Sequence, residues 1–136
     1  MAKVTGIGGV FIKCNDVENA KNWYQKHLGF NTDTYGTTFQ WLTTDSKKIG
    51  HTQWSVFKKD SSYFAPSTKP FMINFRVDDL VALREKLINE GVTVLDEIET
   101  FEYGKFMHIL DLENNKIELW EPIDEVYHQI CQVFTP

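Results

Sequence analysis

The chain contains an internal repeat, and this repeat limits the possible folds more than any other feature. An alternating segment at residues 10–14, followed by a helical pattern, returns at residues 73–77 with a second helical pattern behind it. Each copy is followed by a Tyr-Gly pair, an aspartate and a tryptophan, which are Tyr35-Gly36, Asp45 and Trp54 in the first copy and Tyr103-Gly104, Asp111 and Trp120 in the second. A unit of this size cannot bury its own apolar face, so we expect the copies to pack together with a cleft between them.

Both copies begin with a strand that has one wholly apolar face. Its members are Val10, Ile12 and Cys14 in the first copy and Ile73, Phe75 and Val77 in the second. Their period of two is that of a β-strand, and the helical pattern after each strand ends at a glycine. The opposite faces mix aromatic and polar residues. We therefore predict an α+β fold in which tandem βαβββ units form a curved mixed sheet, with helices on its outer face and a ligand on its concave face.

The unit boundaries follow from the same pattern. We expect one domain over residues 1–136, with a first unit at 5–57, a second unit at 71–122 and a polar linker at 58–70. Residues 92–95 indicate a short additional strand, and residues 45–48 a polar turn. In the segment 123–136, apolar residues at helix-like spacing predict a short helix that docks on the rest of the domain.

Composition excludes two classes of partner. The net charge is −5 and the basic residues form no run, which is untypical of a nucleic-acid-binding surface. No apolar run approaches the roughly 20 residues that a membrane span requires. The first residues lack the pattern of a signal peptide, and Cys14 and Cys131 do not form a disulfide framework. We therefore expect a cytoplasmic protein with free thiols.

One segment carries a family resemblance. Residues 111–122 read DLENNKIELWEP. They resemble the closing Asp-Pro-x-Gly-Asn-x-Ile-Glu-Leu segment of the vicinal oxygen chelate superfamily, which includes glyoxalase I, fosfomycin-resistance proteins, extradiol dioxygenases and bleomycin-binding proteins. The opening of the second unit is also typical of that superfamily, and the resemblance covers roughly residues 5–123. It implies a fold rather than a reaction, because this fold hosts many chemistries.

The resemblance also implies a divalent metal, held by a histidine in the first strand and a carboxylate in the last strand of each unit. The two histidine positions correspond to Gly9 and Met72, which offer no suitable ligand atom. Glu118 matches one carboxylate, and Thr52 replaces the other. A register shift of one residue adds His51 as a candidate metal ligand beside Glu118. That pair still falls short of the three protein ligands typical of catalytic zinc, so we expect no metal and no other cofactor.

We expect aromatic side chains to fill the cup instead, because a concave aromatic wall binds flat or partly apolar molecules by stacking. The predicted ligand-binding residues are Phe11, Phe39, Trp41, Trp54, Asn74, Arg76, His108, Glu118 and Trp120. A carboxylate such as Glu118 is costly in an apolar cup unless it is paired or protonated. Glu118 could pair with Arg76 or Lys13, or with a cationic group of the ligand. Alternatively, its pKa could be raised and the carboxyl group could act in acid–base catalysis.

Three functions fit these residues. The first is a metal-free, bleomycin-resistance-like protein that binds a partly aromatic or apolar small molecule. The second is a glyoxalase-type lyase with a degenerate metal site that contains Glu118 and His51. The third is a metal-free enzyme, an isomerase for example, in which Glu118 is the catalytic proton shuttle. The aromatic content and the apolar C-terminal segment also lead us to expect a homodimer.

Overall fold

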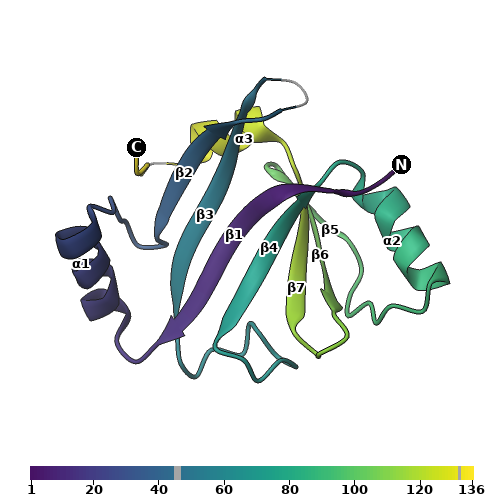
Figure 1. The fold of residues 1–136 in the computed structure, drawn as a ribbon, viewed down its shortest axis with the longest axis horizontal. Helices are drawn as coiled ribbons and strands as arrows, with labels where there is room; N and C mark the ends of the chain where they lie inside the picture. Colours follow the sequence, from purple (N-terminus) through teal and green to yellow (C-terminus); the bar gives the residue numbers. More distant parts are fainter. Residues whose placement is uncertain (45–46, 132) are drawn as a thin grey trace.

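One seven-stranded sheet runs through the molecule, with the strand order β2-β3-β1-β4-β7-β6-β5 (Figure 1). The computed structural model describes residues 1–44, 47–131 and 133–136, so Asp45 of the repeat lies outside the described residues. The elements are β1 (Val4–Cys14), α1 (Val17–Leu28), β2 (Thr37–Leu42), β3 (Ile49–Lys58), β4 (Phe71–Val77), α2 (Leu80–Asn89), β5 (Glu99–Phe101), β6 (Gly104–Leu110), β7 (Lys116–Pro122) and α3 (Asp124–Ile130). The predicted α+β fold with a curved mixed sheet is confirmed.

The first strands of the two units lie side by side at the centre of the sheet. β1 and β4 are antiparallel, with Gly9 opposite Asn74 and Phe11 opposite Met72. Each of them pairs on its other side with the last strand of its own unit, β3 or β7, in parallel. Both units of one chain therefore contribute to the same concave face.

The helices of the two repeated units, α1 and α2, each begin at an aspartate. The side chain of Asp16 accepts a hydrogen bond from the backbone N–H of Asn19 at 3.1 Å, and Asp79 accepts one from Ala82 at 3.1 Å. Such caps stabilise a helix by about 1 kcal/mol, because they satisfy backbone donors that have no partner within the helix. α1 ends at Gly29, whose φ of 73° lies in the left-handed region.

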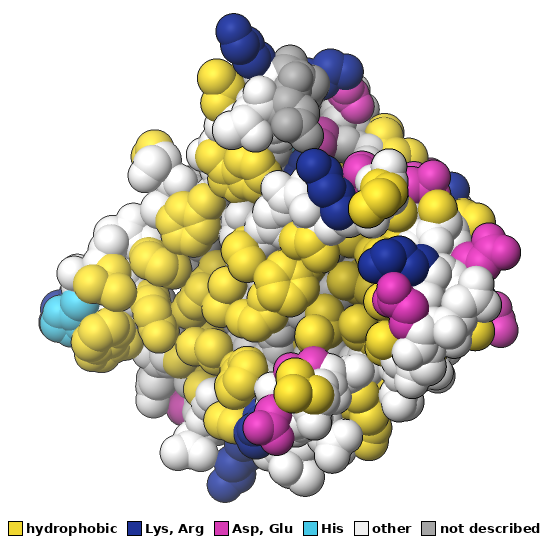
Figure 2. Space-filling view, turned by 45° about the vertical axis from the view of Figure 1, so that its right-hand side comes forward, with side chains coloured by type: hydrophobic (Ala, Val, Ile, Leu, Met, Phe, Trp, Pro, Cys, Tyr) yellow, Lys and Arg dark blue, Asp and Glu magenta, His cyan; other side chains and the backbone are white. Residues whose placement is uncertain are grey.

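The two helices cover only the sides of the outer sheet face. α2 packs on the outer residues of β4, β6 and β7, where Val77, Leu80, Leu83, Met107 and Leu119 form a buried core. Between α1 and α2 the centre of the outer face stays uncovered, and hydrophobic side chains gather there (Figure 2). These residues form the outer patch, which consists of Ile7, Val10, Ile12, Phe71, Ile73 and Phe75 on β1 and β4. Ile7 is 42% exposed and Phe71 38% exposed.

Two segments enclose the concave face at its ends. The linker between β3 and β4 places Phe64, fully buried, against Phe11 and Met72. At the other end, α3 lies over the sheet and contacts β3 (Figure 1). None of the described helices is long and apolar enough to cross a membrane.

One expected strand is wrong. Residues 92–95 make a single bridge, between Val94 and Ile109, and the strand that follows α2 is β5 at Glu99–Phe101. A short apolar run indicates burial equally well in a strand or in an irregular segment, so its pattern did not separate the two.

Candidate functional site

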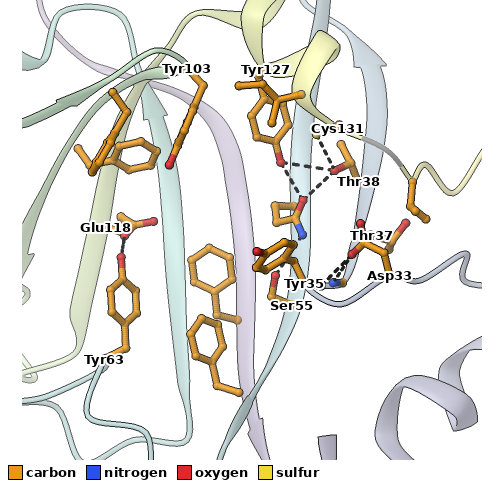
Figure 3. A pocket seen from close by; sticks show the side chains of 18 of the residues that line it. Asp33, Tyr35, Thr37, Thr38, Ser55, Tyr63, Tyr103, Glu118, Tyr127 and Cys131 are labelled. Carbon is orange, nitrogen blue, oxygen red and sulfur yellow. Dashed lines mark hydrogen bonds between the residues drawn. The ribbon is translucent and has the colours of Figure 1, made fainter. Parts of the chain in front are cut away.

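The concave face contains a cavity of about 770 Å³, which we call the inner hollow. Its wall comes from six strands, the linker between β3 and β4, the segment before β2 and the segment around α3 (Figure 3). Eight of the lining residues are aromatic, namely Phe11, Tyr35, Phe57, Tyr63, Phe101, Tyr103, Phe106 and Tyr127. A cavity of this size and composition is suited to a small organic ligand.

The repeated Tyr-Gly pairs contribute one tyrosine from each unit to this wall. Gly36 and Gly104 have φ values of 137° and 134°, which favour glycine. A Cβ atom at Gly36 would lie 1.9 Å from the backbone oxygen of Trp54, and one at Gly104 would lie 2.2 Å from that of Glu121. The two glycines therefore allow tight turns that bring Tyr35 and Tyr103 to the inner hollow.

Glu118 lies at the centre of a hydrogen-bonded cluster in the wall of the inner hollow. Its Oε1 atom accepts a hydrogen bond from Asn74 Nδ2 at 2.7 Å. Its Oε2 atom lies 2.8 Å from His108 Nε2 and accepts a further hydrogen bond from the Tyr63 hydroxyl. The other ring nitrogen of His108 lies 2.6 Å from Asp96 Oδ2. Glu118, only 4% exposed, therefore has partners for both oxygens.

These contacts fix the protonation states of the cluster. Burial would raise the pKa of Glu118, but hydrogen bonds from His108, Tyr63 and Asn74 outweigh it and lower that pKa. Burial would lower the pKa of His108, but hydrogen bonds to Glu118 and Asp96 raise it. Burial raises the pKa of Tyr63, and the charge of Glu118 raises it further. At neutral pH the cluster therefore holds a carboxylate and a neutral phenol, and the raised pKa of His108 favours its imidazolium form.

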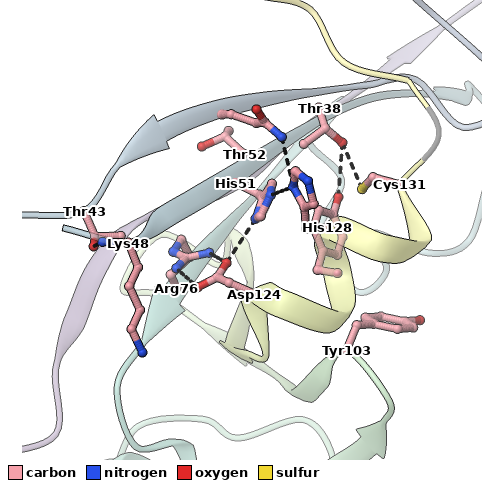
Figure 4. Close-up of polar contacts among 12 residues, drawn as sticks. Thr38, Thr43, Lys48, His51, Thr52, Arg76, Tyr103, Asp124, His128 and Cys131 are labelled. Atoms are coloured by element: carbon pink, nitrogen blue, oxygen red, sulfur yellow. Dashed lines mark hydrogen bonds and ion pairs between the residues drawn. The ribbon is translucent and has the colours of Figure 1, made fainter. Parts of the chain in front are cut away.

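A second buried charge cluster fixes α3 to the sheet (Figure 4). The terminal nitrogens of Arg76 donate to the two carboxylate oxygens of Asp124 at 2.8 and 2.7 Å. His51, which is fully buried, places Nδ1 3.1 Å from Asp124 and Nε2 3.3 Å from His128. Burial would raise the pKa of Asp124, but hydrogen bonds from Arg76 and His51 lower it to about 2. This cluster holds α3 across one end of the inner hollow.

Six of the nine predicted ligand-binding residues do not line the inner hollow, and one of these, Asn74, is buried behind Glu118. Arg76 pairs with Asp124 rather than with Glu118, and its guanidinium lies 5.0 Å from the ring of Trp41 and 5.6 Å from that of Trp120. Trp120 is buried one layer behind the wall and stacks on Phe106. The remaining two lie on the outer face, where α1 covers them.

Trp54 and Phe39 are those two residues. Trp54 lies 4.5 Å from the ring of Tyr24 on α1 and 4.9 Å from that of Phe30. Phe39 also packs on Phe30, at 5.3 Å. The prediction assumed that Trp54 corresponds to Trp120, but β3 pairs Trp54 with the outward-facing Val10. One residue of difference in register moves a side chain to the opposite face of a sheet.

The other predicted residues do meet on the inner side. Phe11, His108 and Glu118 line the inner hollow, and Asn74 is buried behind Glu118. Sequence reasoning missed Tyr63, Asp96 and Tyr127, among others. Tyr63 lies in the linker, where no periodic pattern indicated a role. Tyr103, by contrast, belongs to the repeated Tyr-Gly pair, and that repetition was a usable signal.

The residues present do not fit the divalent metal that the fold family implies. A Cβ atom at Gly9 would lie 2.7 Å from the Phe11 ring, so the first histidine position is filled by a phenyl group. Met72, at the second position, is fully buried against Phe64 and Phe11. Glu118 is engaged by three donors, and His51 is engaged beneath α3 rather than beside Glu118. Within the described part of the chain, no three His, Cys, Asp or Glu side chains are grouped so that they could hold an ion.

Comparison with known proteins identifies the family. The model of the glyoxalase/bleomycin resistance protein/dioxygenase superfamily matches residues 6–119. The chain belongs to this superfamily. This result agrees with the family resemblance of residues 111–122. It also agrees with the observed fold, in which two units join through β1 and β4 and share one concave face. No curated protein matches the chain in a sequence comparison.

Solved structures show the same fold at low sequence identity. A methylmalonyl-CoA epimerase of Streptomyces coelicolor, in complex with 2-nitronate-propionyl-CoA, is 18% identical, with a TM-score of 0.67 over 89% of this chain and 99% of the epimerase chain. Methylmalonyl-CoA epimerase from Mycobacterium tuberculosis is 20% identical, with a TM-score of 0.58 over 92% and 93% of the two chains. At these identities the similarity establishes the fold alone.

Proposed function

We propose that this superfamily member binds a partly aromatic or apolar small molecule in the inner hollow without a metal ion, as a bleomycin-resistance-like protein does. The observation that carries the proposal is the wall of eight aromatic residues around about 770 Å³. Stacking and the burial of apolar area supply the affinity at such a wall. Gly9 and Met72 occupy the two expected histidine positions and do not fit a metal ion, which supports binding through protein side chains alone.

The electrostatics favour binding over proton transfer. A general acid or base works best with a pKa near the working pH. The pKa of Glu118 is lowered and the pKa of Tyr63 is raised, so the carboxylate is a weak base and the phenol a weak acid at neutral pH. The proton-shuttle enzyme, with Glu118 as its catalytic group, is therefore the second candidate, supported by the position of the cluster in the wall of the inner hollow.

A glyoxalase-type lyase and an epimerase have less support. The lyase needs a metal site, and Gly9, which has no side chain, and the buried Met72 do not fit one. A coenzyme A ester carries several phosphate charges, which proteins commonly hold with Lys or Arg. Neither residue type occurs among the described residues that line the inner hollow.

Binding of quinoline, a flat and neutral ring compound, tests the proposal by isothermal titration calorimetry. Phe101 lines the inner hollow and is 44% exposed, while Phe71 lies on the outer patch and is 38% exposed. Removing one contacting ring costs about 1 kcal/mol, so Phe101→Ala should weaken binding roughly 5- to 10-fold. Phe71→Ala is the matched control and should leave the Kd within about twofold. Equal effects of the two variants, or no binding by the wild type, would contradict the proposal.

We also propose a homodimer that forms through the outer patch. Exposed, contiguous apolar surface on a soluble domain favours association. The patch is built on β1 and β4, which are antiparallel and equivalent in the two units, so it has an approximate twofold arrangement of its own. A twofold dimer needs a self-complementary surface, and such an arrangement provides one.

A further inference from the structure

We infer that the inner hollow selects organic cations, meaning ligands that carry a positive charge on a flat, apolar body, such as aromatic amines or quaternary ammonium compounds. The inference rests on the proposed function and names the chemical class of its ligand. It comes from two independent properties of the wall, which are the faces of its aromatic rings and the sign of its charged side chains.

The aromatic rings favour a cation. The face of an aromatic ring carries partial negative charge, and a cation within about 6 Å of the ring centre gains roughly 0.5–2 kcal/mol. Rings reach the inner hollow from two sides, and Figure 3 shows Tyr35, in the segment before β2, across from Tyr103, in the turn between β5 and β6. Phe101 on β5 and Phe106 on β6 also line it. A flat cation between these two sides contacts several rings at once.

The charged side chains of the wall favour a cation as well. Asp33, Glu99 and Glu118 contribute carboxylates, and His108 is the basic side chain among the described lining residues. Glu118 and His108 compensate one another across 2.8 Å. Asp33 and Glu99 remain, and the described residues form no ion pair with either of them. The wall therefore has an excess of negative charge, which no Lys or Arg among the described lining residues offsets.

Two lysines come near the wall without lining the inner hollow. Lys21 donates to the backbone oxygen of Asp33 at 3.0 Å and forms its ion pair with Glu18, also at 3.0 Å. Lys116 donates to the backbone oxygen of Tyr63 and lies 5.2 Å from the centre of its ring. Neither ammonium group lines the cavity, and neither forms an ion pair with Asp33 or Glu99.

Three probes that share one ring system test this selectivity by isothermal titration calorimetry at pH 8. N-methylquinolinium is a cation, quinoline is neutral at this pH, and quinoline-4-carboxylate is an anion. We expect the cation to bind about 10-fold more tightly than quinoline, and the anion to bind more weakly than quinoline. The double variant Asp33→Asn/Glu99→Gln should reduce the preference for the cation to about 2- to 3-fold and leave the quinoline Kd unchanged.

A matched control separates local charge from net charge. Asp60→Asn/Glu90→Gln changes the net charge equally at two exposed residues that do not line the inner hollow, and should keep the 10-fold preference. Asparagine at position 33 retains the oxygen that accepts hydrogen bonds from the backbone N–H groups of Tyr35 and Gly36, so the turn is preserved. Equal binding of cation and neutral probe, or an equal loss in both double variants, would overturn the inference and leave the proposed function intact. Failure of all three probes to bind would overturn both.

Discussion

The inner hollow and the outer patch lie on opposite faces of one sheet, and both are rich in apolar side chains. The wall of the inner hollow is interrupted by polar groups, mainly Glu118 and His108, which are hydrogen-bonded to each other and, in the case of Glu118, to Asn74 behind the wall. The outer patch has only aliphatic and phenyl side chains. A concave apolar wall with a few fixed polar groups is suited to a small molecule, whereas a wholly apolar patch is suited to another protein surface. Polar content, rather than hydrophobicity, therefore distinguishes the two surfaces.

The largest expected effect follows from breaking the polar cluster of the inner hollow. Glu118→Gln removes the carboxylate that His108 and Tyr63 contact and leaves a buried imidazolium with Asp96 as its remaining partner. We expect the free energy of unfolding, measured in urea, to fall by about 3 kcal/mol. Glu113→Gln, in the exposed turn before β7, should change it by less than about 0.5 kcal/mol. Equal stability of the two variants would contradict the assigned ion pair.

A charge on the outer patch tests the other side of the comparison. Ile7→Glu places two carboxylates in a twofold interface, one from each chain, and should raise the dimer Kd roughly 100-fold or more in sedimentation experiments. Leu112→Glu, at a residue that is 94% exposed in a turn, should have little effect. A wild-type protein that stays monomeric at high concentration would rule out the proposed dimer.

The pH dependence of stability separates the charge clusters from the apolar surfaces. In the folded state the pKa values of Glu118 and Asp124 are below their ordinary values. Their contribution to the free energy of unfolding is therefore present above about pH 4 and is lost as the pH falls through the folded pKa, which is about 2 for Asp124. His108 has a folded pKa above 6.5, so its contribution is complete below pH 6.5 and is lost as the pH rises through the folded value.

We therefore expect the free energy of unfolding to be greatest between about pH 5 and pH 6.5 and to decline on both sides. Urea unfolding between pH 2.5 and pH 9 measures this profile. His108→Gln should remove the alkaline decline and keep the acid one. An alkaline decline of unchanged size in that variant would show that His108 does not cause it.

The smallest expected effect sharpens the boundary of the inner hollow. Trp54 packs under α1 against Tyr24 and Phe30, on the far side of the sheet. Trp54→Phe should therefore leave the Kd for quinoline within about twofold, while it lowers the free energy of unfolding by about 1 kcal/mol. A loss of binding as large as that of Phe101→Ala would place the ligand elsewhere.

The sequence allowed the two faces of β1, β4 and β7 to be predicted, because a period of two is a local property of a strand. It did not allow the faces of β2 and β3 to be predicted. Trp54 was matched to Trp120 by counting along the chain, yet Trp54 pairs with Val10 on the outer side and Trp120 with Arg76 on the inner side. Sheet register depends on pairing with distant strands, which counting within one unit does not reveal.

The candidate site was predictable to a similar extent. Glu118 was indicated by the family resemblance of residues 111–122 together with its strand face, and His108 by its place in a strand. Tyr63 comes from the linker, and its hydrogen bond with Glu118 joins residues 55 positions apart. Asp124 and Arg76 meet only because α3 folds back over the sheet. Such contacts depend on where the loops and α3 lie in the folded structure, and no local sequence pattern predicts those positions.

Removal of metal ions tests the central claim most directly. The account predicts that exhaustively chelated protein binds quinoline with the same Kd as untreated protein, within about twofold, and that added Mn²⁺, Ni²⁺ or Zn²⁺ does not change it. The reason is that Gly9 and the buried Met72 offer no suitable ligand atom for these ions. Binding that disappears on chelation and returns with one equivalent of a divalent ion per chain would contradict it.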